Sequence, residues 1–125
     1  MGMIVKISCK CGYSKKLYCG AGIAACNINM LNKLFPSQII SEFEEYKSKD
    51  MVKTFIMENE ITYCKQCKDI NTTCVLKYEL QDGKKIERIN KCNRCYGDVE
   101  ILDYNNLLCP NCANKLLIQE VGSWD

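Results

Sequence analysis

The chain has 125 residues, which is enough for one compact domain or two very small ones. Its 11 cysteines are close to nine per cent of the sequence, near the level at which cysteine chemistry decides a fold. The formal charge is +2 without a long basic run, so the chain lacks the general electrostatic footprint of a nucleic-acid-binding protein.

Neither end of the chain nor its interior shows a signal for export or membrane insertion. Residues 1–13 lack the apolar stretch of a secretory signal, and no window approaches 18 consecutive apolar residues. An odd number of cysteines also argues against complete disulfide pairing. We therefore expect a cytoplasmic protein that does not associate with membranes.

The first half of the chain predicts a hairpin followed by two helices. Residues 3–8 and 15–18 are strand-like and flank the first cysteine pair. Residues 27–34 predict a short helix, which ends before Pro36. Ser37 is a candidate N-cap for a second helix, whose apolar residues share one face at helical spacing and which we expect to continue to about Met57.

The second half predicts short strands between cysteine-containing turns. Strand-like residues 61–63 lead into one cysteine pair, and residues 74–80 alternate before Asp82-Gly83. Asp-Gly between two such segments is a strong hairpin signal, and residues 84–90 are the partner strand. Residues 99–102 and 116–118 predict a second hairpin.

Eight of the cysteines form four closely spaced pairs, which are candidate metal ligands. Two thiolates in one tight turn can reach the same ion at about 2.3 Å, and two such turns complete a tetrahedral site. The pairs are Cys9/Cys11, Cys64/Cys67, Cys92/Cys95 and Cys109/Cys112. We interpret the remaining three, Cys19, Cys26 and Cys74, as small apolar residues rather than functional ones.

The segment KCNRCYGDVEILDYNNLLCPNCANKLL, within residues 91–118, resembles the zinc-ribbon family. It has a cysteine turn, 13 residues that allow a hairpin, and a second turn of the CPxC type. The resemblance implies a single structural zinc ion with four cysteine ligands, namely Cys92, Cys95, Cys109 and Cys112. It implies no particular function.

The remaining pairs then form a second zinc site in the simplest assignment, from Cys9, Cys11, Cys64 and Cys67. The sequence CKCGY is similar to a ribbon turn with one spacer residue missing. A rival assignment uses the local set Cys9, Cys11, Cys19 and Cys26.

The predicted fold class is α+β, with two small zinc-ribbon-like modules of short antiparallel strands. We expect the first module at residues 1–80, with a helical insertion at about 28–57, and the second at residues 81–125. Two zinc ions are the expected cofactors.

The sequence indicates a non-catalytic metal-stabilised binding module rather than an enzyme. It contains no histidine, the commonest general base and a frequent ligand of catalytic zinc, and no small-molecule substrate is evident. A protein partner is slightly favoured, and a nucleic-acid-binding ribbon of the transcription apparatus is an alternative. Candidate contact residues are Lys85, Arg88, Arg94, Tyr96 and Trp124. Another alternative is a rubredoxin-like electron-transfer protein with iron in place of zinc.

Overall fold

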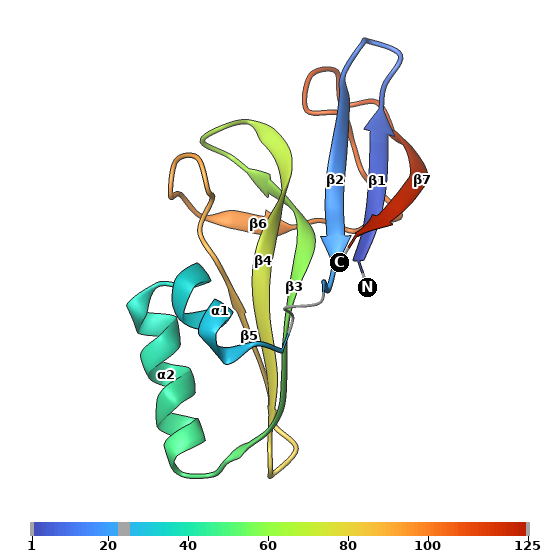
Figure 1. Ribbon diagram of the computed structural model, residues 1–125. Coiled ribbons are helices and arrows are strands. Elements are labelled where there is room, and N and C mark those ends of the chain that lie inside the picture. Colours follow the sequence, from blue (N-terminus) through green and yellow to red (C-terminus); the bar gives the residue numbers. More distant parts are fainter. Residues whose placement is uncertain (1, 23–25, 125) are drawn as a thin grey trace.

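The computed structural model describes residues 2–22 and 26–124 and shows a mostly β protein with two short helices. Seven strands form one antiparallel sheet in the order β5-β4-β3-β2-β1-β7, and β6 pairs with β3 off this path (Figure 1). The strands are β1 Gly2–Ser8, β2 Ser14–Gly20, β3 Val52–Cys64, β4 Asp69–Leu80, β5 Lys85–Ile89, β6 Val99–Ile101 and β7 Leu117–Trp124, and the helices are α1 Ile28–Leu34 and α2 Ser37–Ser48. None of the described helices is long and apolar enough to cross a membrane.

The expectation of two separate modules is wrong, because strands from both halves of the sequence join one sheet. The expected hairpin between residues 99–102 and 116–118 does not form. Instead β6 pairs with the end of β3, and β7 pairs with β1 along almost its whole length. An edge along seven-residue β1 offers a longer hydrogen-bonded ladder than three-residue β6 can provide, which explains why β7 pairs there.

Two groups of strands can be distinguished within the sheet, β1-β2-β7 and β3-β4-β5-β6. The strand pairing between them consists of one residue pair, Gly20 with Asn59. The Asn59 side-chain amide supports this junction by donating to the carbonyl oxygen of Tyr18 at 3.1 Å. The two groups therefore depend on side-chain contacts as well as on the ladder to hold their relative position.

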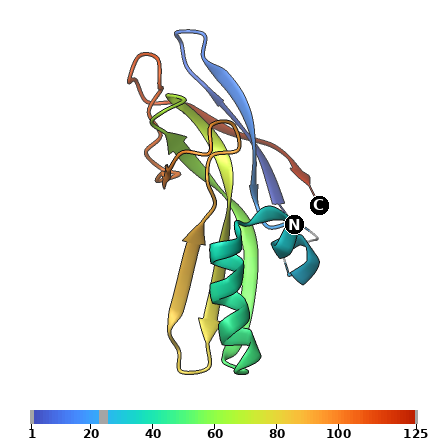
Figure 2. The same ribbon diagram turned by 90° about the vertical axis from the view of Figure 1, so that its left-hand side faces the viewer.

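Two clusters of buried apolar side chains form the interior. The first core joins both groups of strands and comprises Val5, Ile7, Leu17, Cys19, Ile61, Ile70, Leu107, Cys109 and Leu116. The second core lies between the helices and the strands β3 to β5 and comprises Leu31, Phe35, Phe43, Met57, Leu76, Tyr78, Leu80 and Ile86. Figure 2 shows α2 lying along one face of these strands.

The helices differ from the expectation at two points. Helix α1 begins after Asn27, whose side chain accepts from the amide of Asn29 at 2.9 Å, but Ser37 is the first residue of α2 rather than its cap. Helix α2 ends at Ser48, and Asp50 has a left-handed φ of 56°. Residues 52–57, which we expected to be helical, belong to β3, where pairing with β4 satisfies their backbone groups.

Phe43 and an ion pair of Glu42 help to fix helix α2 to the sheet. Phe43 is fully buried and makes edge-on contacts with the rings of Phe55 and Tyr78, at centroid distances of 5.3 and 5.0 Å. Beside it, the Glu42 carboxylate accepts from Arg88 Nε at 2.8 Å and from Nη2 at 3.1 Å. The helix thus covers the second core with both an apolar and a charged contact.

Replacing Phe43 with alanine should lower the free energy of unfolding by about 3–5 kcal/mol, because a fully buried ring leaves a cavity. Urea denaturation monitored by circular dichroism measures this change. The matched control is Leu34→Ala on α1, which is 42% exposed and should cost about 1 kcal/mol or less. Equal effects of the two substitutions would contradict the packing described for α2.

Candidate metal centres

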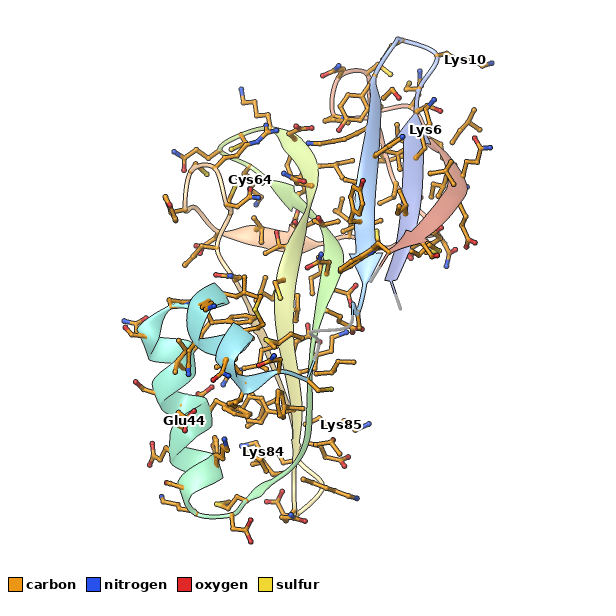
Figure 3. All side chains as sticks on the ribbon, viewed as in Figure 1. Lys6, Lys10, Glu44, Cys64, Lys84 and Lys85 are labelled. Carbon is orange, nitrogen blue, oxygen red and sulfur yellow. The ribbon has the colours of Figure 1, made fainter. Side chains whose placement is uncertain are left out.

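The eight paired cysteines gather into two clusters at one end of the sheet. The terminal cluster contains Cys9, Cys11, Cys109 and Cys112, and the inner cluster contains Cys64, Cys67, Cys92 and Cys95. Within each cluster the four sulfur atoms lie within 4.8 Å of one another. Figure 3 shows Lys10 and Cys64 at this end, with Lys84 and Lys85 at the other.

The structure pairs the cysteine turns differently from the expectation. We expected Cys92/Cys95 to share a site with Cys109/Cys112, but these two pairs lie in different clusters. The rival local set is also wrong, because Cys19 pairs with Met3 at the end of the β1–β2 hairpin opposite its turn.

The strand register explains this exchange of partners. Strand β6 follows the Cys92–Cys95 turn, and its Val99 pairs with Cys64 at the end of β3. Strand β7 follows the Cys109–Cys112 turn, and its Leu117 pairs with Ser8 beside Cys9. Each strand therefore carries the turn before it to a different hairpin.

All four cysteine turns share one backbone design. In each, the residue after the second cysteine has a positive φ and donates its amide to the carbonyl of the first cysteine. These residues are Gly12, Lys68, Tyr96 and Ala113, with φ of 101°, 54°, 58° and 64° and N···O distances of 3.0, 2.7, 3.0 and 2.8 Å. The turn at Cys9 is one residue shorter than the others, and it closes with a glycine at the largest φ.

The sulfur spacing fits a four-coordinate metal ion. In the terminal cluster the sulfurs lie 3.3 Å apart for Cys9 and Cys112 and 3.6 Å apart for Cys11 and Cys109. In the inner cluster they lie 3.5 Å apart for Cys64 and Cys95 and 3.8 Å apart for Cys67 and Cys92. A tetrahedron with metal–sulfur bonds of about 2.3 Å has edges of about 3.8 Å, whereas a disulfide needs about 2.05 Å. The arrangement therefore accommodates an ion at each cluster.

Backbone amides favour thiolates at selected cysteines. An amide hydrogen bond from Cys95 lowers the pKa of the Cys92 thiol to about 6. Burial opposes ionisation of Cys109, but amides of Asn111 and Cys112 outweigh it and lower its pKa to about 7. By contrast, the neighbouring Cys95 sulfur raises the pKa of Cys67. Four adjacent thiolates repel one another, so full ionisation of either cluster requires a cation among them.

Among the residues that the structure describes, the three cysteines outside the clusters form no further metal-ligand group. Cys19 lies in the first core and Cys74 packs against the second. Burial raises the pKa of both thiols to about 11, so both are protonated at neutral pH. Cys26 is exposed, with its sulfur 3.4 Å from the carbonyl oxygen of Phe55.

The five residues considered as partner contacts do not share one surface. Lys85 and Arg88 lie on β5, and Arg88 is already bound to Glu42. Arg94 and Tyr96 belong to the inner cluster's second turn, where Tyr96 is 78% exposed.

Trp124 lies at the end of β7, on the opposite edge of the sheet from β5. Its indole Nε1 donates to the carbonyl of Cys19 at 2.9 Å, and its ring lies edge-on to Tyr18. A side chain on Gly2 would clash with this ring, since an added Cβ would lie 2.2 Å from it. Trp124 thus anchors the end of β7.

Sequence reasoning missed Asp69, which directly follows a turn of the inner cluster and bonds to residues that follow a turn of the terminal cluster. Its carboxylate accepts from the Tyr13 hydroxyl at 2.7 Å and from Lys15 Nζ at 2.9 Å. Partial burial opposes ionisation, but the hydrogen bonds from Lys15 and Tyr13 hold the pKa of Asp69 below its usual value. No sequence signal links these residues, because more than 50 positions separate them.

Comparison with known proteins identifies a short region of similarity. No family model and no solved structure matches the chain. The DNA-directed RNA polymerase subunit Rpo12 of Halobacterium salinarum and that of Haloquadratum walsbyi are each 43% identical to it over 30 residues. The match covers 24% of this chain and 68% of each relative. Through this short segment the chain belongs to the Rpo12 family, and about three quarters of its length lies outside the match.

Proposed function

We propose that this protein holds one zinc ion in each cysteine cluster and acts as a non-catalytic binding module of the transcription apparatus, with another polypeptide as its partner. The observation that carries the proposal is that each cluster brings together four sulfurs from two turns of the same design. Four protein ligands fill a tetrahedral site and leave no position for a substrate, which is typical of structural zinc.

Zinc fits these clusters better than most ions. A set of four soft thiolates in tetrahedral arrangement selects zinc or iron, whereas calcium and magnesium require oxygen ligands. An iron ion in the same ligand set would support electron transfer. The identity of the bound metal therefore distinguishes a structural module from an electron-transfer protein.

The metal ions would contribute a large share of the folding free energy. A structural zinc site of this kind provides on the order of 10 kcal/mol in small zinc domains. Here the two groups of strands share a single ladder pair, Gly20 with Asn59, and the terminal cluster would fasten the ends of the described chain to each other. The proposed role of zinc is therefore to hold a binding surface rather than to react.

The similarity to a polymerase subunit supports a place in transcription, and the open edge of the sheet supports a polypeptide partner. Strand β7 pairs only with β1 among the described strands, and Glu120 is its sole charged residue. Leu117 and Val121 on this strand are 68% and 44% exposed. The other edge, β5, carries three charged residues in five, which discourages strand addition. An extended segment of a partner protein would add to β7.

Protein purified without added metal should contain about two zinc ions per chain and show no visible colour. Elemental analysis and an absorption spectrum measure both properties. Cys74→Ala is the control, because Cys74 lies outside the clusters and its loss should leave the zinc content unchanged. Stoichiometric iron with thiolate charge-transfer bands would instead favour the electron-transfer alternative.

Paired substitutions test which cysteines share an ion. The double variant Cys11→Ser/Cys109→Ser damages one cluster and should retain about one zinc ion per chain. The double variant Cys92→Ser/Cys109→Ser damages both and should retain none. Zinc content by elemental analysis distinguishes them, and the reverse result would restore the contiguous ribbon assignment.

The chain should bind purified RNA polymerase from its own organism, and Val121→Lys should weaken this binding at least about tenfold by placing a charge on the open β7 edge. Co-sedimentation of the reduced, zinc-loaded protein measures the affinity. Glu87→Lys, which changes an exposed charge on β5, is the matched control and should bind normally. Binding that disappears after nuclease treatment would make nucleic acid the partner, and unchanged binding of Val121→Lys would exclude the β7 edge.

A further inference from the structure

We propose that Asp69 is a positioning residue that couples the two clusters, so that zinc bound at one favours binding at the other. This inference rests on the metal-binding part of the proposed function and is independent of any partner. It assigns a role to a residue that ligates neither ion.

The link to the terminal cluster runs through Tyr13. Its carbonyl oxygen accepts the amide of Cys9 at 2.8 Å, and its hydroxyl donates to Asp69 Oδ1 at 2.7 Å. Lys15, two residues further along, donates from Nζ to Asp69 Oδ2 at 2.9 Å and to the carbonyl of Ile70 at 2.8 Å. The turn that contains Cys9 and Cys11 is therefore tied to the start of β4.

Asp69 is linked to the inner cluster more directly than to the terminal cluster. Asp69 follows the Cys64–Lys68 turn directly and pairs with Cys64 across the β3–β4 ladder. Arg94 lies between Cys92 and Cys95, and its Nη1 lies 3.6 Å from Asp69 Oδ2. One carboxylate thus contacts or adjoins three of the four metal-binding turns.

The contact between Lys15 and Asp69 is partly shielded from water, whereas the side chain of Arg94 is 59% exposed. The side chains of Lys15 and Asp69 are 20% and 25% exposed, compared with 61% and 70% for Lys49 and Glu45. Partial burial reduces the screening of the Lys15–Asp69 pair by water and salt, so this interaction is stronger than that of an exposed ion pair. The first core also connects the two groups of strands, but its contacts are apolar and not directional. Asp69 instead makes a directed hydrogen bond to Tyr13, beside the terminal turn.

The expected consequence is cooperative metal loading. Zinc at the terminal cluster fixes the turn at residues 9–12 and with it Tyr13 and Lys15, which then hold Asp69 and the adjoining inner turn in place. By thermodynamic linkage, zinc at the inner cluster raises the affinity of the terminal cluster by the same factor. A factor of about tenfold is typical of coupling between two binding sites.

Native mass spectrometry of reduced, metal-free protein with one equivalent of zinc counts chains that carry no, one or two ions. For two equal sites with tenfold coupling, the one-zinc species is about a quarter of the protein, against about half for independent sites. In Asp69→Asn, which keeps the shape and removes the charge, this fraction should rise about twofold. Tyr13→Phe, which removes a single hydroxyl, should raise it in the same direction and serves if the first variant does not fold.

The direction of the change separates coupling from a general loss of stability. A less stable fold would make zinc binding more nearly all-or-none and would lower the one-zinc fraction. Glu42→Gln, which breaks the ion pair with Arg88 on α2, is the control and should not raise it.

Two other results would overturn the inference in distinguishable ways. Wild-type protein that binds no zinc would refute the proposed function and the coupling together. Two zinc ions in the wild type, with the same one-zinc fraction in Asp69→Asn and Tyr13→Phe, would refute the coupling alone.

Discussion

The pairing of β7 with β1 is the interaction on which the rest of the structure depends. It runs from Gly2 with Trp124 to Ser8 with Leu117, and so brings the two ends of the described chain side by side. At one end of this ladder the indole of Trp124 is fixed to Cys19. At the other end the register places the Cys109–Cys112 turn against the turn at Cys9.

The two clusters are consequently nested in the sequence. Cys11 and Cys109 are 98 positions apart, and they enclose Cys67 and Cys92, which are 25 apart. Because the entropy of loop closure rises only with the logarithm of length, the longer loop costs about 1 kcal/mol more than the shorter one. This difference is small compared with the roughly 10 kcal/mol that a bound structural zinc ion would contribute. Chain length therefore does not prevent the distant pairing, and the sheet register can select it.

As a result of this nesting, each cluster joins a different set of segments. The inner cluster gathers the turn at the end of β3 and the turn that precedes β6, while the terminal cluster joins the β1–β2 hairpin to the turn that precedes β7. The groups of strands that carry them share one ladder pair, the first core and the hydrogen bonds of Asp69. The terminal cluster adjoins β7, and these shared contacts connect it to the strands that carry the inner cluster.

Local signals predicted most of the secondary structure and failed where two readings were possible. The Asp82-Gly83 turn and the hairpin around it formed as expected, since Gly83 adopts a φ of 91° that glycine allows. Residues 52–57 were assigned to a helix because Val52, Phe55 and Ile56 fit helical spacing. β-Branched and aromatic residues such as these are also common in strands, and pairing with β4 decided for a strand.

The sequence by itself determined which eight cysteines gather and the turns that present them, because ligand spacing and turn closure depend on neighbouring residues alone. Only the tertiary structure decided which turns share a cluster, since Leu117 beside Ser8 and Val99 beside Cys64 are pairings between distant strands. The same holds for Asp69, whose contacts with Tyr13 and Lys15 exist only when two hairpins lie side by side. Spacing within a segment carries no information about which other segment will be its neighbour, and strand pairing supplies it.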